Sequence, residues 1–207
     1  MADQEAINKV MAMIEAHDVK FVDFRFTDFH GKWQHISAPT HFVSEELFEN
    51  GLGFDGSSIA GWCEIHQSDM LFIPNPATAV LDPFAEYPTI IFFCDIRDPF
   101  TGEGYSRDPR SAAQRAEAYL KYTGIGDTCF VGPEPEFFIF DSVRYSNQMQ
   151  HSFFKIDSEE GAWATGDKMD GANHGHIPGV KGGYFPVPPI DSFQDLRSEM
   201  TLTLEQM

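Results

Sequence analysis

The chain has 207 residues, of which 42% are hydrophobic and 14% aromatic, so it can form one large globular domain or two small ones. Its 32 acidic residues against 14 Lys and Arg give a formal net charge of −18. This balance argues against nucleic acid and anionic membrane surfaces as partners, because both require neutralising cationic side chains. The most apolar run, residues 89–94, is far shorter than the roughly 20 residues of a membrane-spanning helix.

The cysteines and the N-terminal residues indicate in which cellular compartment the protein is found. Cys63, Cys94 and Cys129 show no CxxC spacing, and an odd count argues against a disulfide framework. Residues 1–19 carry apolar side chains at helical spacing, which predicts an amphipathic helix and not a secretory signal. These features predict a cytoplasmic protein.

The first hundred residues predict a small mixed sheet with short helices. Alternating polarity over residues 21–26 indicates a half-buried strand, and a turn at His30-Gly31 leads into a second strand to form a hairpin. Residues 44–50 predict a short helix capped by Ser44. Three further apolar segments, separated by proline and glycine, predict additional strands of the same sheet: residues 69–74, 78–84 and 89–96.

Turn-forming residues concentrated near residue 105 predict a domain boundary. Two Asp-Pro steps and two glycines lie within residues 97–109. Asp108 then fits an N-cap with Pro109 at the first helical position, and Gly124 fits the helix stop. We therefore expect two domains, residues 1–105 and 106–207.

The last segment, residues 191–207, predicts a helix. Ser192 and Asp195 have capping-box spacing, and an apolar stripe continues to Met207 without a stop signal. We expect from this pattern that the sequence is the amino-terminal part of a longer protein.

Residues 53–62, "GFDGSSIAGW", form a loop with an unusual composition. Glycine and small hydroxyl side chains let the main chain approach a ligand or another chain closely. The same composition also suits an ordinary turn between a helix and a strand. The residues alone leave both interpretations open.

Residues 130–141, "FVGPEPEFFIFD", contain a pair of acids at strand spacing. In an extended strand Glu134 and Glu136 share one face, with side chains about 6.5 to 7 Å apart. That spacing suits one carboxylate for each of two ions, and oxygen ligands favour Mg²⁺ or Mn²⁺. The spacing alone also fits two solvated acids at a strand tip. His174 and His176 are typical of a glycine-rich loop, and we do not assign them as ligands.

Residues 180–192, "VKGGYFPVPPIDS", combine a Gly-Gly pair with a proline-rich exit. Tyr184 lies where the two meet. An aromatic residue in this position is typical of a side chain that anchors a loop.

These motifs together resemble class I, bacterial-type glutamine synthetases. The segments "FDGSSIAGW", "GPEPEFFIFD", "EGAW", "VKGGYFPVPPIDS" and "RSEM" occur in the order and separation of that family, and the resemblance covers essentially all 207 residues. It implies an α+β fold, with a small β-grasp-like amino-terminal domain followed by the beginning of a larger α+β catalytic domain. It also implies a homo-oligomer whose active sites form between adjacent subunits, each receiving the loop of residues 53–62 from its neighbour.

The resemblance also implies roles for individual residues. Asp55 matches the acid that binds and deprotonates ammonium, and Ser58 and Tyr184 match residues that line the same cation pocket. Glu134 and Glu136 match carboxylate ligands of two divalent metal ions, Mg²⁺ or Mn²⁺. The implied reaction uses glutamate, ammonium and ATP, and it forms glutamine through γ-glutamyl phosphate.

The remaining metal ligands and the phosphate-binding arginines of the family are expected beyond Met207, so we expect the 207-residue chain alone to be inactive. Two alternatives stay open. One is a related ligase that joins glutamate to a polyamine or to methylamine. The other is a non-catalytic assembly module that retains the fold.

Overall fold

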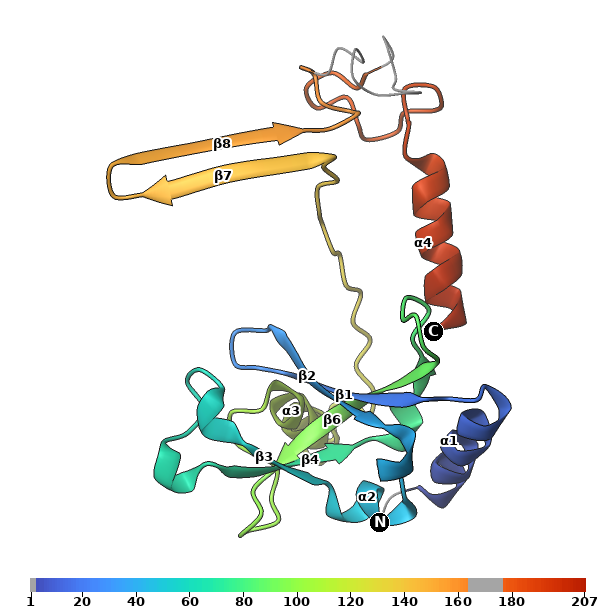
Figure 1. Cartoon of the computed structure of the whole chain (residues 1–207), viewed down its shortest axis with the longest axis vertical. Coiled ribbons are helices and arrows are strands. Elements are labelled where there is room, and N and C mark those ends of the chain that lie inside the picture. Colours follow the sequence, from blue (N-terminus) through green and yellow to red (C-terminus); the bar gives the residue numbers. More distant parts are fainter. Residues whose placement is uncertain (1–2, 164–176) are drawn as a thin grey trace. The chain divides into compact units, whose positions relative to one another are not determined.

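The computed structural model describes residues 3–163 and 177–207, so His174 and His176 lie outside the described residues. The chain forms two compact units, residues 1–131 and residues 132–206. Figure 1 traces both in chain order. None of the described helices is long and apolar enough to cross a membrane.

The first unit begins with a helix and a hairpin. Helix α1, Gln4–Ala16, starts where the Asp3 side chain accepts a hydrogen bond from the Glu5 amide. Strands β1, Phe21–Thr27, and β2, Trp33–Pro39, pair antiparallel, as the sequence predicts. Gly31 has a φ of +80° in the connecting turn, a conformation that favours glycine.

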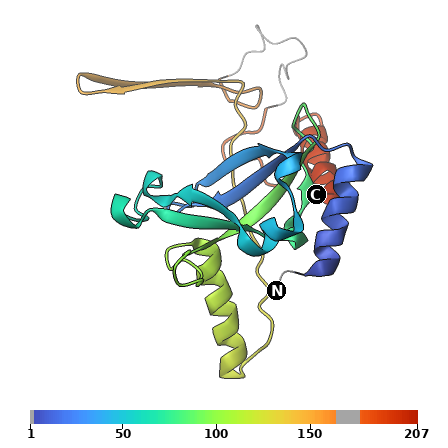
Figure 2. The same ribbon diagram turned by 60° about the horizontal axis from the view of Figure 1, so that its bottom comes forward.

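The remaining strands build one mixed sheet, which confirms the sequence prediction. Helix α2 follows Ser44 as expected, although the Ser44 side chain makes no capping hydrogen bond. The sheet has the order β2-β1-β6-β4-β3, with β5 paired to β6, and only the β1–β6 pairing is parallel. Figure 2 shows the curled sheet from a second side. The bounds are α2 Glu45–Asn50, β3 Leu52–Asp55, β4 Asp69–Pro74, β5 Val80–Leu81 and β6 Thr89–Arg97, with 3-10 turns at Thr40–Phe42, Gly56–Ser58, Ile65–Gln67 and Pro76–Thr78.

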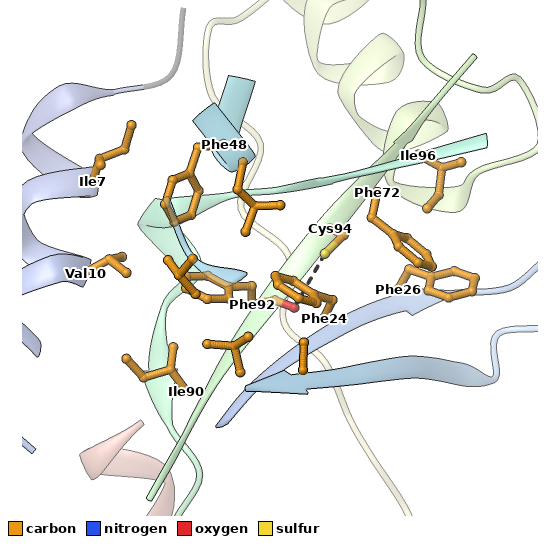
Figure 3. Packing of buried hydrophobic residues seen from close by; sticks show 14 of the residues in the cluster. Ile7, Val10, Phe24, Phe26, Phe48, Phe72, Ile90, Phe92, Cys94 and Ile96 are labelled. Atoms are coloured by element: carbon orange, nitrogen blue, oxygen red, sulfur yellow. Dashed lines mark hydrogen bonds between the residues drawn. The ribbon is translucent and has the colours of Figure 1, made fainter. Parts of the chain in front are cut away.

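One face of this sheet carries the hydrophobic core. Alternate residues of β1 and β6, among them Phe24 and Phe92, are fully buried, and helices α1 and α2 contribute Ile7, Val10 and Phe48 to the same cluster (Figure 3). The core extends through aromatic contacts toward the β3–β4 end of the sheet. The helices therefore fix the sheet from which the loop after β3 projects.

Strand β1 also contains a buried acid, which alternates along the strand with the core residues. Asp23 is 3% exposed, and its carboxylate accepts hydrogen bonds from Arg25 Nε at 2.6 Å and Ser37 Oγ at 2.7 Å, with His35 Nδ1 at 2.6 Å. Burial alone would raise the pKa of Asp23, but these hydrogen bonds outweigh it and lower the pKa. The carboxylate is thus held ionised.

Helix α3, Pro109–Thr123, ends the regular structure of the first unit. The buried Asp108 side chain accepts hydrogen bonds from the amides of Arg110 and Ser111, as an N-cap should. Gly124 takes the left-handed conformation at the C-terminal end, with a φ of 69°. Both ends of this helix agree with the sequence prediction.

The second unit contains a hairpin that the sequence analysis missed, β7 Ser142–Gln148 paired antiparallel with β8 His151–Asp157. Its helix α4, Gln194–Gln206, confirms the expected helix but not the expected cap. Ser192 instead donates hydrogen bonds from its amide and its hydroxyl to Glu160 Oε1, at 3.1 and 2.9 Å. The capping-box prediction was wrong because α4 begins at Gln194, two positions after Ser192, and the Ser192 side chain binds Glu160 instead.

Candidate active site

Asp55 ends strand β3 and begins the segment that we call the Asp55 loop, residues 55–68. The carboxylate caps the 3-10 turn that follows: Oδ1 accepts from the Ser57 amide at 2.8 Å and from the Ser57 hydroxyl at 2.6 Å. The Ser58 hydroxyl lies 3.4 Å from Oδ2. The Ser57 hydroxyl, then its amide, lower the pKa of Asp55. The side chain is exposed, so it presents an ionised carboxylate to the surroundings.

Gly56 allows the loop to pack closely against β4. Its amide donates to the Ser68 carbonyl at 2.7 Å, and a Cβ at this position would lie 2.7 Å from Met70 Cγ. Glycine is therefore required here by close approach and not by an unusual φ. At Gly56, therefore, the small residue has a structural cause inside this chain.

Trp62 anchors the far part of the Asp55 loop in the core. The indole is 1% exposed and packs on Phe26, with ring centroids 5.4 Å apart, and on Phe54 at 6.1 Å. A tryptophan buried in this way resists displacement, because removing a side chain of this size from the core costs several kcal/mol, roughly 3–5. The loop is therefore exposed at Asp55 and Ser58, and the buried Trp62 side chain holds its far part in place.

The predicted strand over residues 130–141 is wrong. Residues 128–140 have no regular secondary structure, and no strand in the described part of the chain pairs with them. Pro133 and Pro135 lack amide donors, which weakens any ladder here. Glu134 and Glu136 are exposed, and neither makes an ion pair with another described residue.

The glutamates of this segment provide only part of the ligands that a divalent metal ion needs. Carboxylate oxygens are the ligands that Mg²⁺ and Mn²⁺ prefer, and Glu134 and Glu136 are available to bind them. Within residues 3–163 and 177–207, no group of three or more His, Cys, Asp or Glu side chains is arranged to hold a metal ion. These two glutamates are therefore compatible with metal binding but do not complete a site among the described residues.

Tyr184 lies in a segment without helix or strand and is 84% exposed. Its ring makes an edge contact with Phe185, with centroids 4.4 Å apart. The predicted anchoring role is thus wrong for the described residues, because so exposed a ring contributes little to packing. Of the predicted site residues, Asp55 and Ser58 lie together in the first unit, and Glu134, Glu136 and Tyr184 belong to the second.

The mixed sheet with its covering helices and the acid-bearing loop define a β-grasp domain, followed by a second unit of hairpin and helix. The family model "Glutamine synthetase, beta-Grasp domain" matches residues 18–99, and "Glutamine synthetase, catalytic domain" matches residues 106–207. The chain belongs to the glutamine synthetase family.

Similar proteins support this membership along nearly the whole chain. It is 56% identical over 202 residues to a glutamine synthetase of Vibrio cholerae and 56% identical over 198 residues to that of Escherichia coli K12. It is also 57% identical over 203 residues to a "3-hydroxylaminophenol mutase" of Cupriavidus pinatubonensis. These alignments cover 98%, 96% and 98% of this chain but 43%, 42% and 43% of the relatives. The chain thus spans less than half the length of these relatives.

A solved structure confirms the fold. The Plasmodium falciparum glutamine synthetase, determined by cryo-electron microscopy, superposes with a TM-score of 0.80 at 21% identity. The match covers 97% of this chain and 40% of that one. The α+β class expected from the sequence is therefore confirmed.

Proposed function

We propose that the chain forms part of a glutamine synthetase that ligates ammonia to glutamate. In the first step the γ-phosphoryl group of ATP is transferred to the side-chain carboxylate of glutamate, giving γ-glutamyl phosphate and ADP. In the second step ammonia attacks the acyl carbon and phosphate leaves, giving glutamine. The observation that carries this proposal is the 56% identity to named glutamine synthetases over nearly the whole chain.

Asp55 is the residue that we propose to act on ammonium. Ammonium has no lone pair and must lose a proton before it can attack an acyl phosphate, so a nearby carboxylate serves as the base. The hydrogen bonds from Ser57 lower the pKa of Asp55, which keeps it anionic and attractive to a small cation. Ser58, within reach of the same carboxylate, and Tyr184 line the cation pocket in this proposal.

Glu134 and Glu136 are proposed to hold divalent metal ions, Mg²⁺ or Mn²⁺. Such ions neutralise the charge of ATP and stabilise the phosphoryl group during its transfer. The exposed carboxylates supply hard oxygen ligands, and the formal charge of −18 makes cations necessary if anionic substrates are to bind. In this proposal the other ligands come from other parts of the assembled enzyme.

The same proposal assigns the domains and the assembly. Residues 1–105 form the β-grasp-like domain and residues 106–207 the start of the catalytic domain. In a cytoplasmic homo-oligomer, the Asp55 loop would complete the active site of an adjacent subunit. The exposure of Asp55 at the end of an edge strand supports a role outside its own domain.

Activity assays test the proposal. We expect no glutamine from the 207-residue chain alone, and Mg²⁺- or Mn²⁺-dependent glutamine formation from ammonium, glutamate and ATP by an oligomeric protein that extends this chain to the length of its relatives. Preference for a polyamine or methylamine over ammonium would indicate the related ligases. An inactive protein without a specific Mn²⁺ site would indicate an assembly module.

One relative makes a further assay necessary. The similarity to the protein named 3-hydroxylaminophenol mutase is as high as that to the synthetases. The extended protein should therefore also be offered 3-hydroxylaminophenol, in the presence and absence of ATP. Turnover of this compound without glutamine formation would overturn the ligase proposal.

A further inference from the structure

Two side chains from the segment between β6 and α3 hold the backbone of the Asp55 loop. The Tyr105 hydroxyl donates to the Trp62 carbonyl oxygen at 2.6 Å. Arg107 Nη1 lies 2.6 Å from the carbonyl oxygens of both Gly61 and Trp62. These bonds join residues more than 40 positions apart in the sequence, and the sequence analysis did not find them.

The segment that supplies these donors is itself fixed to the sheet. The Tyr105 amide donates to the Ile96 carbonyl in β6 at 2.8 Å, and the Asp108 amide donates to the Tyr105 carbonyl at 3.1 Å. Asp108 is fully buried and caps α3. Tyr105 and Arg107 therefore connect the loop to a rigid strand and a rigid helix end.

Besides the buried Trp62 ring, the loop has internal hydrogen bonds from the Ile59 amide to the Gly56 carbonyl at 3.1 Å and from the Trp62 amide to the Ile59 carbonyl at 3.2 Å. Its base is closed by the hydrogen bond from the Gly56 amide to Ser68, and Trp62 Nε1 has no hydrogen-bond partner among the described residues. A groove of about 870 Å³ separates part of the loop from residues 98–107. The hydrogen bonds to Gly61 and Trp62 join the two sides of this groove.

Arg107 is suited to this task by its chemistry. A guanidinium group offers several donors in a rigid plane, and hydrogen bonds from a charged donor are about twice as strong as neutral ones. Arg107 makes no ion pair with a described residue, so the two carbonyl oxygens are its polar partners on this side. Tyr105 adds a ring contact, with its centroid 5.3 Å from that of Trp62.

We infer that Tyr105 and Arg107 are positioning residues for ammonium use: they fix the middle of the Asp55 loop and thereby the orientation of the Asp55 carboxylate. This inference rests on the proposed function of Asp55. When the bonds to Gly61 and Trp62 are removed, the loop gains freedom, and Asp55 loses its alignment with ammonium. Glutamate and ATP do not contact the loop in this account, so their use is unaffected.

Kinetics of the extended, oligomeric protein test the inference. Arg107→Met removes the guanidinium but keeps an aliphatic chain, and Tyr105→Phe removes one donor. We expect Arg107→Met to lower kcat/KM for ammonium roughly tenfold, since small misplacements of a reacting group have effects of this order or larger. KM for glutamate and ATP should stay unchanged, Tyr105→Phe should have a smaller effect, and Arg107→Lys should restore part of the activity.

Arg115→Met is the matched control. Arg115 also donates to a carbonyl oxygen of the same segment, that of Ser106 at 3.2 Å, but among the described residues no hydrogen bond or ion pair joins it to the Asp55 loop. It should leave kcat/KM for ammonium unchanged. Combining Arg107→Met with Asp55→Asn should cause little loss beyond Asp55→Asn alone, because Arg107 acts through Asp55.

Hydrogen exchange of the loop amides separates the possible failures. We expect faster exchange over residues 57–66 in Arg107→Met than in the wild type or in Arg115→Met. Unchanged exchange, or an unchanged kcat/KM for ammonium in an active enzyme, would overturn the inference while leaving the proposed function intact. A wild-type protein that forms no glutamine would overturn the proposed function, and with it the assignment to ammonium.

Discussion

Replacement of Gly56 by alanine tests the close packing that shapes the Asp55 loop. The added Cβ would lie 2.7 Å from Met70 Cγ, 3.1 Å from Cys63 Sγ and 3.2 Å from the Ser68 carbonyl oxygen. That oxygen also accepts the Gly56 amide at 2.7 Å, so it cannot retreat without weakening this bond. Overpacking of this kind costs about 1–3 kcal/mol of unfolding free energy.

Urea unfolding, followed by tryptophan fluorescence, measures this cost. With a typical slope of about 1–3 kcal/mol per molar urea, the transition should move down by roughly 1 M. Gly53→Ala is the matched control, because no atom lies within 4 Å of a Cβ at that position. The packing argument is refuted if Gly56→Ala and Gly53→Ala unfold at the same urea concentration.

Three further outcomes follow from burial and charge. Trp62→Ala should destabilise the protein by about 3–5 kcal/mol in the same urea assay, whereas Trp33→Ala, at a residue 54% exposed, should cost far less. Because folding lowers the pKa of Asp23, this residue adds to the free energy of unfolding at pH above its unfolded pKa of 3.8, and the contribution is lost as the pH falls toward the folded pKa. In Asp23→Asn, the free energy of unfolding should therefore depend less on pH in this acidic range. A thiol reagent should label exposed Cys129 in the native protein but buried Cys94 only after unfolding, since burial also raises the pKa of the Cys94 thiol.

Local signals were enough to predict much of the first unit. The β1–β2 hairpin follows from alternation around Gly31, and both ends of α3 follow from Asp108 and Gly124. In each case the residues that determine the structure are neighbours in the sequence. The assignment of Asp55 stays a prediction; it came from the unusual composition of its loop and from the family resemblance that this loop carries.

Features that depend on distant partners were not predictable in this way. The acids Glu134 and Glu136 have strand spacing, but a strand also needs a paired neighbour, and none of the described strands supplies one. Ser192 has cap spacing, but Glu160 binds it from 32 positions away. The hydrogen bonds of Arg107 likewise reach back 45 or more positions to carbonyl oxygens, which carry no side-chain signal.

The measurement that tests the central claim most directly is glutamine formation by the extended oligomeric protein and its Asp55→Asn variant. Both would receive saturating glutamate and ATP with Mg²⁺, while ammonium is varied and glutamine and ADP are quantified. The account predicts one glutamine per ADP in the wild type and a large loss of kcat/KM for ammonium in the variant. A wild type that makes no glutamine, or a variant that uses ammonium as well as the wild type, would contradict it.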